Sequence, residues 1–549
     1  MKKIAISLSF FTLFITNVFP QSQIKLIVGI VIEQMRFDYL TKYWDKYSNN
    51  GFKRLFKQGI VYYNASYYYL NINSASSYTN IATGAHPFVH GIIGKQWYDR
   101  THNKIINCVS DEQTTTIGTK KLQTAGSPKK IKAYSFSDQL SLTTLGRSQI
   151  ISIATDMEAA ILSAGYFADY VLWYDDNTGN WITSSYYTKS SMLLPKWVKD
   201  FNELNLTDIY LNNVWTTTYP IDKYTESLPD NNLIEKGIAG QTTFPYQMSI
   251  LKEKVQNKYV LLKYTPFFNT YTKDLAINAI VNLKLGKDKY PDYLFISFQA
   301  NSNISKVFGI RSVEIEDAYI KLDKDLSHLL QTLDDLVGKE NYIVFLTSDQ
   351  GACDNPNFLR NLGLEINFVE TNAYQILLNS YLRAIYKQNN LVEKIFNNQI
   401  YLNQQWIDRS HKDPLQVQRI AADFFMQINS IQIAVPTQLL LNNSFSSGLI
   451  YYAYHSYYPG RSGDIIFTLS PNSFIQTQES YLISQSACYC NDNNNNHLPL
   501  IFYGGSIKPK HIYKHVDITS IATTLSALLK IQKPQNATEP PLDHVVKNN

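Results

Sequence analysis

Cysteine is scarce in this sequence. Only four cysteines occur in 549 residues, and Cys488 and Cys490 are separated by a single residue, which is too close for an ordinary unstrained disulfide. No second pair of Cys or His residues stands at a spacing that would complete a zinc site with them. The cysteine pattern therefore argues against a disulfide framework.

Charge is also sparse. Charged residues make up 17% of the chain and the net charge is +5, which leaves no strong electrostatic case for binding nucleic acid. We therefore expect no nucleic-acid partner. A chain of 549 residues can bury a large core, and ordinarily forms a main domain together with a second domain or large insertions.

Apolar runs of bilayer length are missing from the sequence. Met1-Lys2-Lys3 precedes a short apolar stretch that ends at Ile15, which is the pattern of a secretory signal. The next segment, Asn17-Val18-Phe19-Pro20-Gln21, lacks the small-x-small cleavage pattern, so an uncleaved anchor stays open as the alternative. We predict a signal peptide at residues 1–22 and an exported protein, periplasmic or extracellular, that contacts a membrane only if the signal is uncleaved.

Two apolar segments each lead into an acidic residue. Residues 25–32 precede Glu33, and residues 341–346 precede a short polar stretch that contains Asp349. Both segments are predicted to be buried strands, because they are rich in β-branched and aromatic residues. An acid at the carboxyl end of such a strand lies where open α/β sheets place their chemistry. A polar turn after a core strand is the simpler alternative.

Further strands are predicted at residues 149–154, 293–298 and 498–503, separated by helical or mixed segments. The clearest helix is predicted at 314–333, and residues 34–47 also have helix-like spacing. This alternation predicts an α/β fold whose sheet is covered by helices on both faces.

Two stretches, residues 166–263 and 355–459, are aromatic and polar with weak periodicity. We expect them to be cap insertions above the sheet of one domain at 23–533, because no linker of the Gly/Ser or Pro type separates them. The tail, residues 534–549, is expected to be loosely ordered.

A polar turn at residues 73–79 is predicted to enter a helix that ends near Gly84. Its hydroxyl groups could face the helix N-terminus, where free amides and the helix dipole stabilise an anion. Simple N-caps are the alternative. His86 and His90 follow this helix, and we expect both to be structural.

Ordered motifs along the chain carry a family resemblance. They are Val31-Ile32-Glu33-Gln34-Met35-Arg36-Phe37-Asp38-Tyr39, Thr83-Gly84, His90-Gly91-Ile92-Ile93-Gly94, Trp97-Tyr98-Asp99, Ala159-Ala160-Ile161-Leu162, Trp173-Tyr174-Asp175, Leu194-Pro195-Lys196-Trp197-Val198, Ser348-Asp349-Gln350-Gly351, Tyr458-Pro459-Gly460-Arg461-Ser462-Gly463-Asp464 and Pro499-Leu500-Ile501-Phe502-Tyr503-Gly504. In this order they resemble the phosphate-irrepressible secreted alkaline phosphatases of the alkaline phosphatase superfamily, which also contains nucleotide pyrophosphatases and phosphodiesterases.

The resemblance implies a mostly parallel central sheet flanked by helices, with caps over its carboxyl edge. It also implies a phosphate monoester hydrolase in which two zinc ions stabilise the attacking and leaving oxygens and a Ser or Thr hydroxyl is the nucleophile. In this chain the nucleophile position is Ser74, and a phosphate-binding position is Lys95. The metal-ligand positions that keep an acid are Glu33 and Asp349.

The chain departs from the family pattern at most of the metal-ligand positions. The aspartate after the first strand is Glu33, which is one methylene longer. The Asp and His that follow the third strand are replaced by Ser302 and Lys306, and the His after Asp349 is replaced by Gln350. We therefore expect the zinc ions of the family to be lost.

The other functional positions depart as well. The late His of the family falls near Cys488, and the Pro-Gly-His after the nucleophile is Ser76-Ser77-Tyr78. An Asn that binds phosphate falls at Lys95, while the Lys and Arg aimed at the phosphate fall at Asp156 and Glu158. Two anions in place of two cations should repel a phosphate ester by roughly several kcal/mol in a partly desolvated site.

Three functional hypotheses follow. The first is a pseudoenzyme with weak or no two-zinc activity, whose pocket is stabilised by ion pairs of Lys95 and Lys306 with Glu33, Asp349 and their acidic neighbours. The second is a residual phosphatase or phosphodiesterase with one Mg²⁺ or Ca²⁺ ion on the oxygens of Glu33, Ser74 and Asp349. The third is a binding protein whose aromatic caps hold a carbohydrate or a protein partner.

Overall fold

A computed structural model of the chain describes residues 24–120, 123–188, 192–441, 444–475 and 496–547. The expected signal peptide and the region of Cys488 lie outside these ranges, so both stay predictions. Among the described helices, none has the length and apolarity that a membrane crossing requires.

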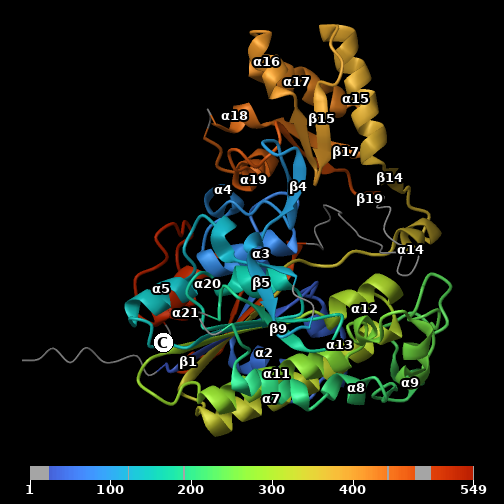
Figure 1. Cartoon of the computed structure of the whole chain (residues 1–549). Helices are drawn as coiled ribbons and strands as arrows, with labels where there is room; N and C mark the ends of the chain where they lie inside the picture. Colours follow the sequence, from blue (N-terminus) through green and yellow to red (C-terminus); the bar gives the residue numbers. More distant parts are fainter. Residues whose placement is uncertain (1–23, 121–122, 189–191, 442–443, 476–495, 548–549) are drawn as a thin grey trace, which may run out of the picture.

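A large central sheet organises the described part of the chain (Figure 1). Its strands in spatial order are β21 (Lys510–Ile512), β2 (Ile60–Ser66), β20 (Leu498–Gly504), β13 (Tyr342–Thr347), β1 (Leu26–Ile32), β12 (Asp292–Phe298), β7 (Ile150–Ala154), β8 (Tyr170–Tyr174), β9 (Trp181–Ser184), β5 (Ser110–Ile117) and β6 (Thr124–Gly126), and β22 (Val516–Asp517) pairs with β2 beside this path.

The centre of the sheet is parallel. β1 pairs in parallel with β12 on one side and with β13 on the other, and β12, β7 and β8 continue the parallel arrangement. The flanking pairs β13–β20, β20–β2 and β8–β9 are antiparallel. All seven residues of β1 are buried, which is why the strand contains no polar side chain.

Helices cover both faces of the sheet (Figure 1), so the predicted fold class is confirmed. One face carries α2 (Phe52–Gln58), α7 (Lys196–Glu203), α11 (Phe267–Leu283) and α13 (Val313–Leu336), and the other carries α3 (Ser74–Thr83), α5 (Phe136–Thr143), α6 (Met157–Ala164) and α20 (Ile521–Leu528). Because side chains alternate along a strand, Val28 and Ile30 of β1 enter the first core while Ile27 and Val31 enter the second.

A second, smaller sheet lies at the top of Figure 1 and has a core of its own. Its strands in spatial order are β15 (Val392–Phe396), β16 (Gln399–Leu402), β18 (Ile465–Leu469) and β17 (Ile431–Pro436), and α15 (Thr371–Tyr386) and α17 (Pro414–Phe425) pack on it. Most of this unit falls in the stretch 355–459 that we expected to be a cap, and β18 extends it beyond that boundary.

The first expected cap, residues 166–263, needs a correction. Its first part supplies β8 and β9 to the central sheet, because Val171, Leu172 and Trp181 are buried in the two main cores. These strands are only five and four residues long, which is too short for a clear periodic signal. The rest of the stretch holds α7 and other short helices.

Two further expectations were wrong. Residues 34–47 form only short helical turns, separated by Tyr43, instead of one helix. The tail is packed on the body as far as residue 547 rather than loosely ordered. Val545 is fully buried, the amide of Leu542 donates to Thr524 Oγ1 at 2.9 Å, and the amide of Thr538 donates to the carbonyl oxygen of Gly84 at 2.9 Å.

Shorter elements complete the described fold. They are α1 (Tyr39–Lys42), η1 (Trp44–Lys46), α4 (Pro87–His90), β3 (Gln96–Asp99), β4 (Lys104–Asn107), η2 (Pro128–Lys130), α8 (Leu206–Tyr210), β10 (Val214–Trp215), η3 (Ile221–Lys223), β11 (Tyr246–Gln247), α9 (Met248–Leu251), η4 (Lys252–Lys254), α10 (Lys258–Leu262), α12 (Ala300–Phe308), α14 (Pro356–Asn361), β14 (Asn367–Val369), α16 (Gln404–Arg409), α18 (Thr437–Leu441), α19 (Gly448–Ser456), β19 (Ser473–Ile475), η6 (Ile518–Ser520) and α21 (Asp543–Val546).

The packed tail generates a stability prediction. Val545→Asp places a charge in the core under α21, so we expect it to lower the free energy of unfolding by about 2–4 kcal/mol. Chemical denaturation of the purified protein measures this change. Val546→Asp is the matched control, because the neighbouring valine is partly exposed and the same substitution there should cost much less. Equal effects of the two substitutions would contradict the packed position of the tail.

Candidate functional site

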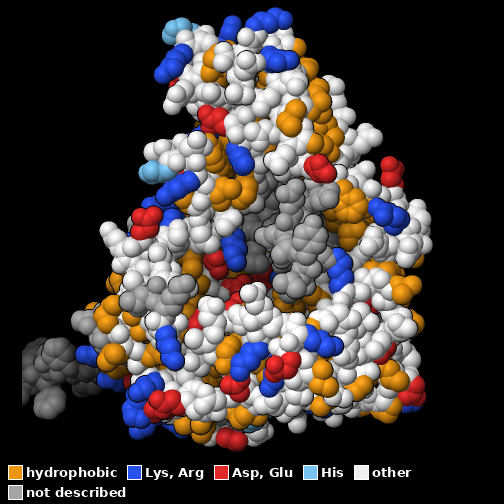
Figure 2. Space-filling model, turned by 45° about the vertical axis from the view of Figure 1, so that its right-hand side comes forward, with side chains coloured by type: hydrophobic (Ala, Val, Ile, Leu, Met, Phe, Trp, Pro, Cys, Tyr) orange, Lys and Arg blue, Asp and Glu red, His pale blue; other side chains and the backbone are white. Residues whose placement is uncertain are grey.

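The register of the three central strands brings their carboxyl ends together. Val31 pairs with Thr347, and Ile32 pairs with Phe298. The residues that follow these strands therefore meet at one edge of the sheet. A cavity of about 830 Å³ opens there, and Figure 2 shows acidic and basic side chains in a hollow across the middle of the molecule. Its polar lining includes Glu33, Ser74, Lys95, Asp156, Glu158 and Lys306.

Ser74 is the first residue of α3, so its hydroxyl sits at a helix N-terminus. The side chain of Asn73 caps this helix by accepting from the amide of Ser76 at 3.0 Å. Ser74 Oγ donates to Asp349 Oδ2 at 2.6 Å, and Gln350 Nε2 donates to Ser74 Oγ at 3.3 Å. The hydroxyl therefore lies within hydrogen-bond reach of a carboxylate, which is the arrangement that a base needs to activate a nucleophile.

Asp349 lies behind Ser74 and is fully buried. Its Oδ1 accepts from the amide of Gln34 at 2.9 Å, and Gln34 turns this amide inward by adopting a left-handed backbone with φ of 56°. Burial raises the pKa of Asp349, and the hydrogen bonds from Ser74 and Gln34 oppose that shift. Both carboxylate oxygens thus have partners that carry no charge.

Glu33 is enclosed by three neutral side chains. Tyr78 Oη donates to Glu33 Oε1 at 3.0 Å, Gln299 Nε2 donates to the same oxygen, and Ser302 Oγ donates to Oε2 at 2.8 Å. Burial, together with the charges of Asp349 and Asp156, raises the pKa of Glu33 to about 8. Glu33 therefore holds a proton at neutral pH, which the hydroxyl partners accommodate because they accept as well as donate.

A second group of charges lies beside α6, and its members Lys95, Asp156 and Glu158 line the cavity. Lys95 Nζ lies 3.5 Å from Glu158 Oε1, and Lys263 Nζ lies 2.9 Å from Asp176 Oδ2. Burial favours the neutral form of Asp156. The positive charges of Lys95, Lys263 and Lys306 together have the larger effect, and they lower the pKa of Asp156. Asp156 therefore stays ionised.

The expected ion pairs form only in part. Lys95 pairs with Glu158, as the first hypothesis requires. Lys306 forms no ion pair within 4.0 Å among the described residues, and its Nζ donates to Asn303 Oδ1 at 3.3 Å. The charge of Lys306 lowers the pKa of Glu33 without an ion pair between the two side chains. The neutral partners of Glu33 already surround its carboxyl group. The expected pairing of Lys306 with Asp349 was wrong.

The structure thus brings Glu33, Ser74 and Asp349 together, and places Lys95 at the wall of the same cavity. Sequence reasoning missed Gln299, and it recognised Tyr78 only as a departure from the family. Gln299 directly follows β12. Its position at the carboxyl end of a buried strand, the same position that drew attention to Glu33 and Asp349, could have indicated this amide as well. No local signal indicates that Tyr78 reaches back to Glu33.

Comparison with known proteins places the chain in a family. Residues 27–495 match the family model of type I phosphodiesterase / nucleotide pyrophosphatase. The chain therefore belongs to this family, within the alkaline phosphatase superfamily.

Within the family, the chain is similar to alkaline phosphatases. It is 34% identical over 535 residues to alkaline phosphatase PafA of Elizabethkingia meningoseptica, with 97% of this chain and 96% of the relative covered. It is also 34% identical over 525 residues to a Myroides odoratus protein named calcium-transporting ATPase, with 95% of each chain covered. The crystal structure of wild type PafA matches with a TM-score of 0.87 and 32% identity, over 96% of this chain and 100% of that one. The resemblance predicted from the sequence is confirmed.

The raised pKa of Glu33 predicts a pH-dependent stability. Folding raises this pKa from 4.5 to about 8, so the folded state binds the proton more tightly than the unfolded state does. Stability from this group is complete below pH 4.5 and is lost as the pH rises through 8. We expect the free energy of unfolding to fall by on the order of a few kcal/mol between pH 5 and 9.

Glu33→Gln tests this assignment, because the amide stays neutral at every pH. Denaturation should be measured across this range in the presence of a chelator. The variant should lose the part of the pH dependence that Glu33 causes, and a slope identical to that of the wild type would show that Glu33 is ionised in the folded protein.

Proposed function

We propose that this alkaline phosphatase family protein has weak or no two-zinc phosphomonoesterase activity. The observation that carries the proposal is the closed hydrogen-bond network on the two retained acids. Neutral hydrogen-bonding groups contact both carboxyl oxygens of Glu33 and both carboxylate oxygens of Asp349. In a two-zinc site these oxygens would instead face metal ions.

The replaced positions do not fit two zinc ions. Ser302 is hydrogen-bonded to Glu33, and Gln350 donates its amide to Ser74. Lys306 is an ammonium group that donates to Asn303 and has no lone pair for a metal while it is charged. Zinc prefers thiolate, imidazole and carboxylate ligands, and these three side chains supply none of them.

The wall of the cavity also opposes a phosphate monoester, the substrate class that the family suggests. Asp156 stays ionised there, and Glu158 engages the Lys95 ammonium group at 3.5 Å. An incoming phosphate would meet two carboxylates at the positions where the family resemblance implies cations. These two positions therefore no longer supply cations that attract the ester.

A second candidate function is a residual phosphatase or phosphodiesterase with one hard cation. The 2.6 Å hydrogen bond from Ser74 Oγ to Asp349 Oδ2 favours it, because the hydroxyl is already aligned on a carboxylate. Oxygen ligands from Glu33, Ser74 and Asp349 suit Mg²⁺ or Ca²⁺. The third hypothesis is a non-catalytic binding protein whose aromatic caps hold a carbohydrate or a protein partner. Export of the protein stays a prediction from the N-terminal sequence.

Hydrolysis of an aryl phosphate by the dialysed protein tests the proposed function. We expect the rate to lie within a few-fold of the rate of Ser74→Ala, with and without added Zn²⁺, because no described group replaces the lost zinc ligands. Repeating the assay with Mg²⁺ and Ca²⁺ tests the second candidate. Turnover that rises strongly with zinc and disappears in Ser74→Ala would overturn the main proposal.

Restoring family-type ligands tests the physical cause. A variant that carries Glu33→Asp, Ser302→Asp, Lys306→His and Gln350→His should bind more Zn²⁺ per chain than the wild type, because the ammonium group is removed and carboxylate and imidazole ligands are added. Elemental analysis after dialysis measures the gain. A folded variant with no additional zinc would contradict the argument that these four side chains exclude the metal.

A further inference from the structure

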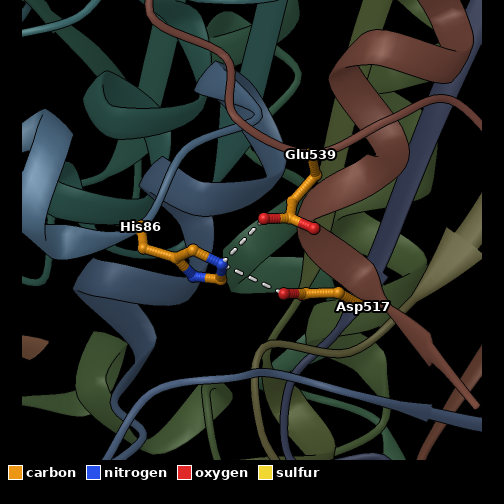
Figure 3. A group of neighbouring side chains, drawn as sticks. All are labelled: His86, Asp517 and Glu539. Carbon is orange, nitrogen blue, oxygen red and sulfur yellow. Dashed lines mark ion pairs between the residues drawn. The ribbon is translucent and has the colours of Figure 1, made fainter. Parts of the chain in front are cut away.

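A second cluster of ligand atoms lies at the opposite end of α3 from Ser74. Within the described residues, only His86, Asp517 and Glu539 form a group of at least three His, Cys, Asp or Glu side chains whose ligand atoms lie within 4.8 Å of one another. His86 Nε2 lies 3.1 Å from Asp517 Oδ2 and 3.4 Å from Glu539 Oε1. Figure 3 shows both carboxylate groups turned toward the same ring nitrogen.

These contacts are not well-aligned hydrogen bonds. His86 Nε2 and Asp517 Oδ2 are both buried, and neither atom has a hydrogen-bond partner. Their side chains are each only 3% exposed, so water does not readily satisfy them. The two atoms are held by this ion pair and lack the aligned hydrogen bonds that buried polar groups usually make.

The surroundings of His86 leave Nε2 available as a ligand. The amide of Asn80 is better oriented with its oxygen toward Thr519 Oγ1, and the same amide atom lies 3.4 Å from His86 Nδ1. In this orientation Nδ1 donates to the Asn80 oxygen, so Nε2 can give up its proton and offer its lone pair when a cation binds between it and the two carboxylates. A partner of this kind on the second nitrogen is the usual support of a metal-bound histidine.

The charge balance also points to a bound cation. Two carboxylates and one imidazolium would bury a net negative charge, and no Lys or Arg of the described residues lies within 4.0 Å of Asp517 or Glu539. A divalent ion bound to a neutral imidazole and two carboxylates would make the cluster neutral.

We propose that His86, Asp517 and Glu539 form a binding site for a zinc-class divalent cation that fastens the C-terminal segment to the end of α3. The observed separations of 3.1 and 3.4 Å match the edge of about 3.3 Å expected between ligands at tetrahedral zinc. One imidazole and two carboxylates are ligands that Zn²⁺ accepts, and water completes the coordination.

The site would join three segments that are distant in sequence. His86 precedes α4, Asp517 ends β22, and Glu539 belongs to the tail. The amide of Thr538 already donates to the carbonyl oxygen of Gly84 at 2.9 Å, so the tail is held beside the C-cap of α3 before any metal binds. The cation would add a cross-link at this point.

Zinc binding to the full-length protein, stripped with a chelator and then dialysed, tests the proposal. Isothermal titration with Zn²⁺ should show one site, and bound Zn²⁺ should raise the melting temperature. Glu539→Gln and His86→Gln should each weaken this binding by about tenfold or more and abolish the zinc-dependent rise. Co²⁺ in the same site should give the absorption of a tetrahedral complex.

Two control variants distinguish this site from zinc bound elsewhere on the protein. His102→Gln changes an exposed histidine that contacts Asp99 at 2.7 Å, and it should leave zinc binding unchanged. Glu33→Gln should also keep it, because the cavity beside Ser74 is a different place. If His86→Gln fails to fold, Glu539→Gln decides, since its side chain is 20% exposed. Absence of zinc binding by the wild type, or unchanged binding by the folded variants, would overturn the proposal.

Discussion

The parallel pairing of β1 with β12 and β13 is the constraint on which the rest of the structure depends. It fixes the register of three fully buried strands, and so it brings Glu33, Gln299 and Asp349 to one edge of the sheet. A shift of one residue in either pairing would move these side chains about 3.3 Å apart along the strands. The cavity, its charges and the position of α3 all follow from this alignment.

Burying two carboxyl groups close together costs free energy unless they are neutralised or hydrogen-bonded. At the innermost positions this chain supplies hydrogen-bond partners that carry no charge. Glu33 keeps a proton and takes its hydrogen bonds from Tyr78, Gln299 and Ser302, while Asp349 uses a main-chain amide and a hydroxyl. The lysines act further out, on the wall of the cavity. In this network every carboxyl oxygen of Glu33 and Asp349 has a hydrogen-bond partner, which is the observation behind the proposed loss of the zinc site.

The sequence predicted the fold better than the site. The strands β1, β7, β12, β13 and β20 have long uniform apolar runs, so their position and type were evident, and a left-handed Gly84 ended α3 as expected. Short strands such as β8 and the packed tail escaped prediction, because their stability comes from contacts with distant residues. For the same reason, the family resemblance pointed to Glu33, Ser74 and Asp349 as site residues but gave no indication that Lys306 would bond to Asn303, or that His86 would meet two acids.

The two ends of α3 depend on different parts of the chain. Ser74 at its start contacts the residue after β13, and Gly84 at its end receives the amide of Thr538 from the tail. A change in the tail near Thr538 would therefore act on an element that braces this helix. The described chain begins at residue 24, at the amino end of β1, which lies at the edge of the sheet opposite the cavity. The two outer segments of the described residues therefore play different parts, because the first begins a central strand away from the cavity and the last braces α3.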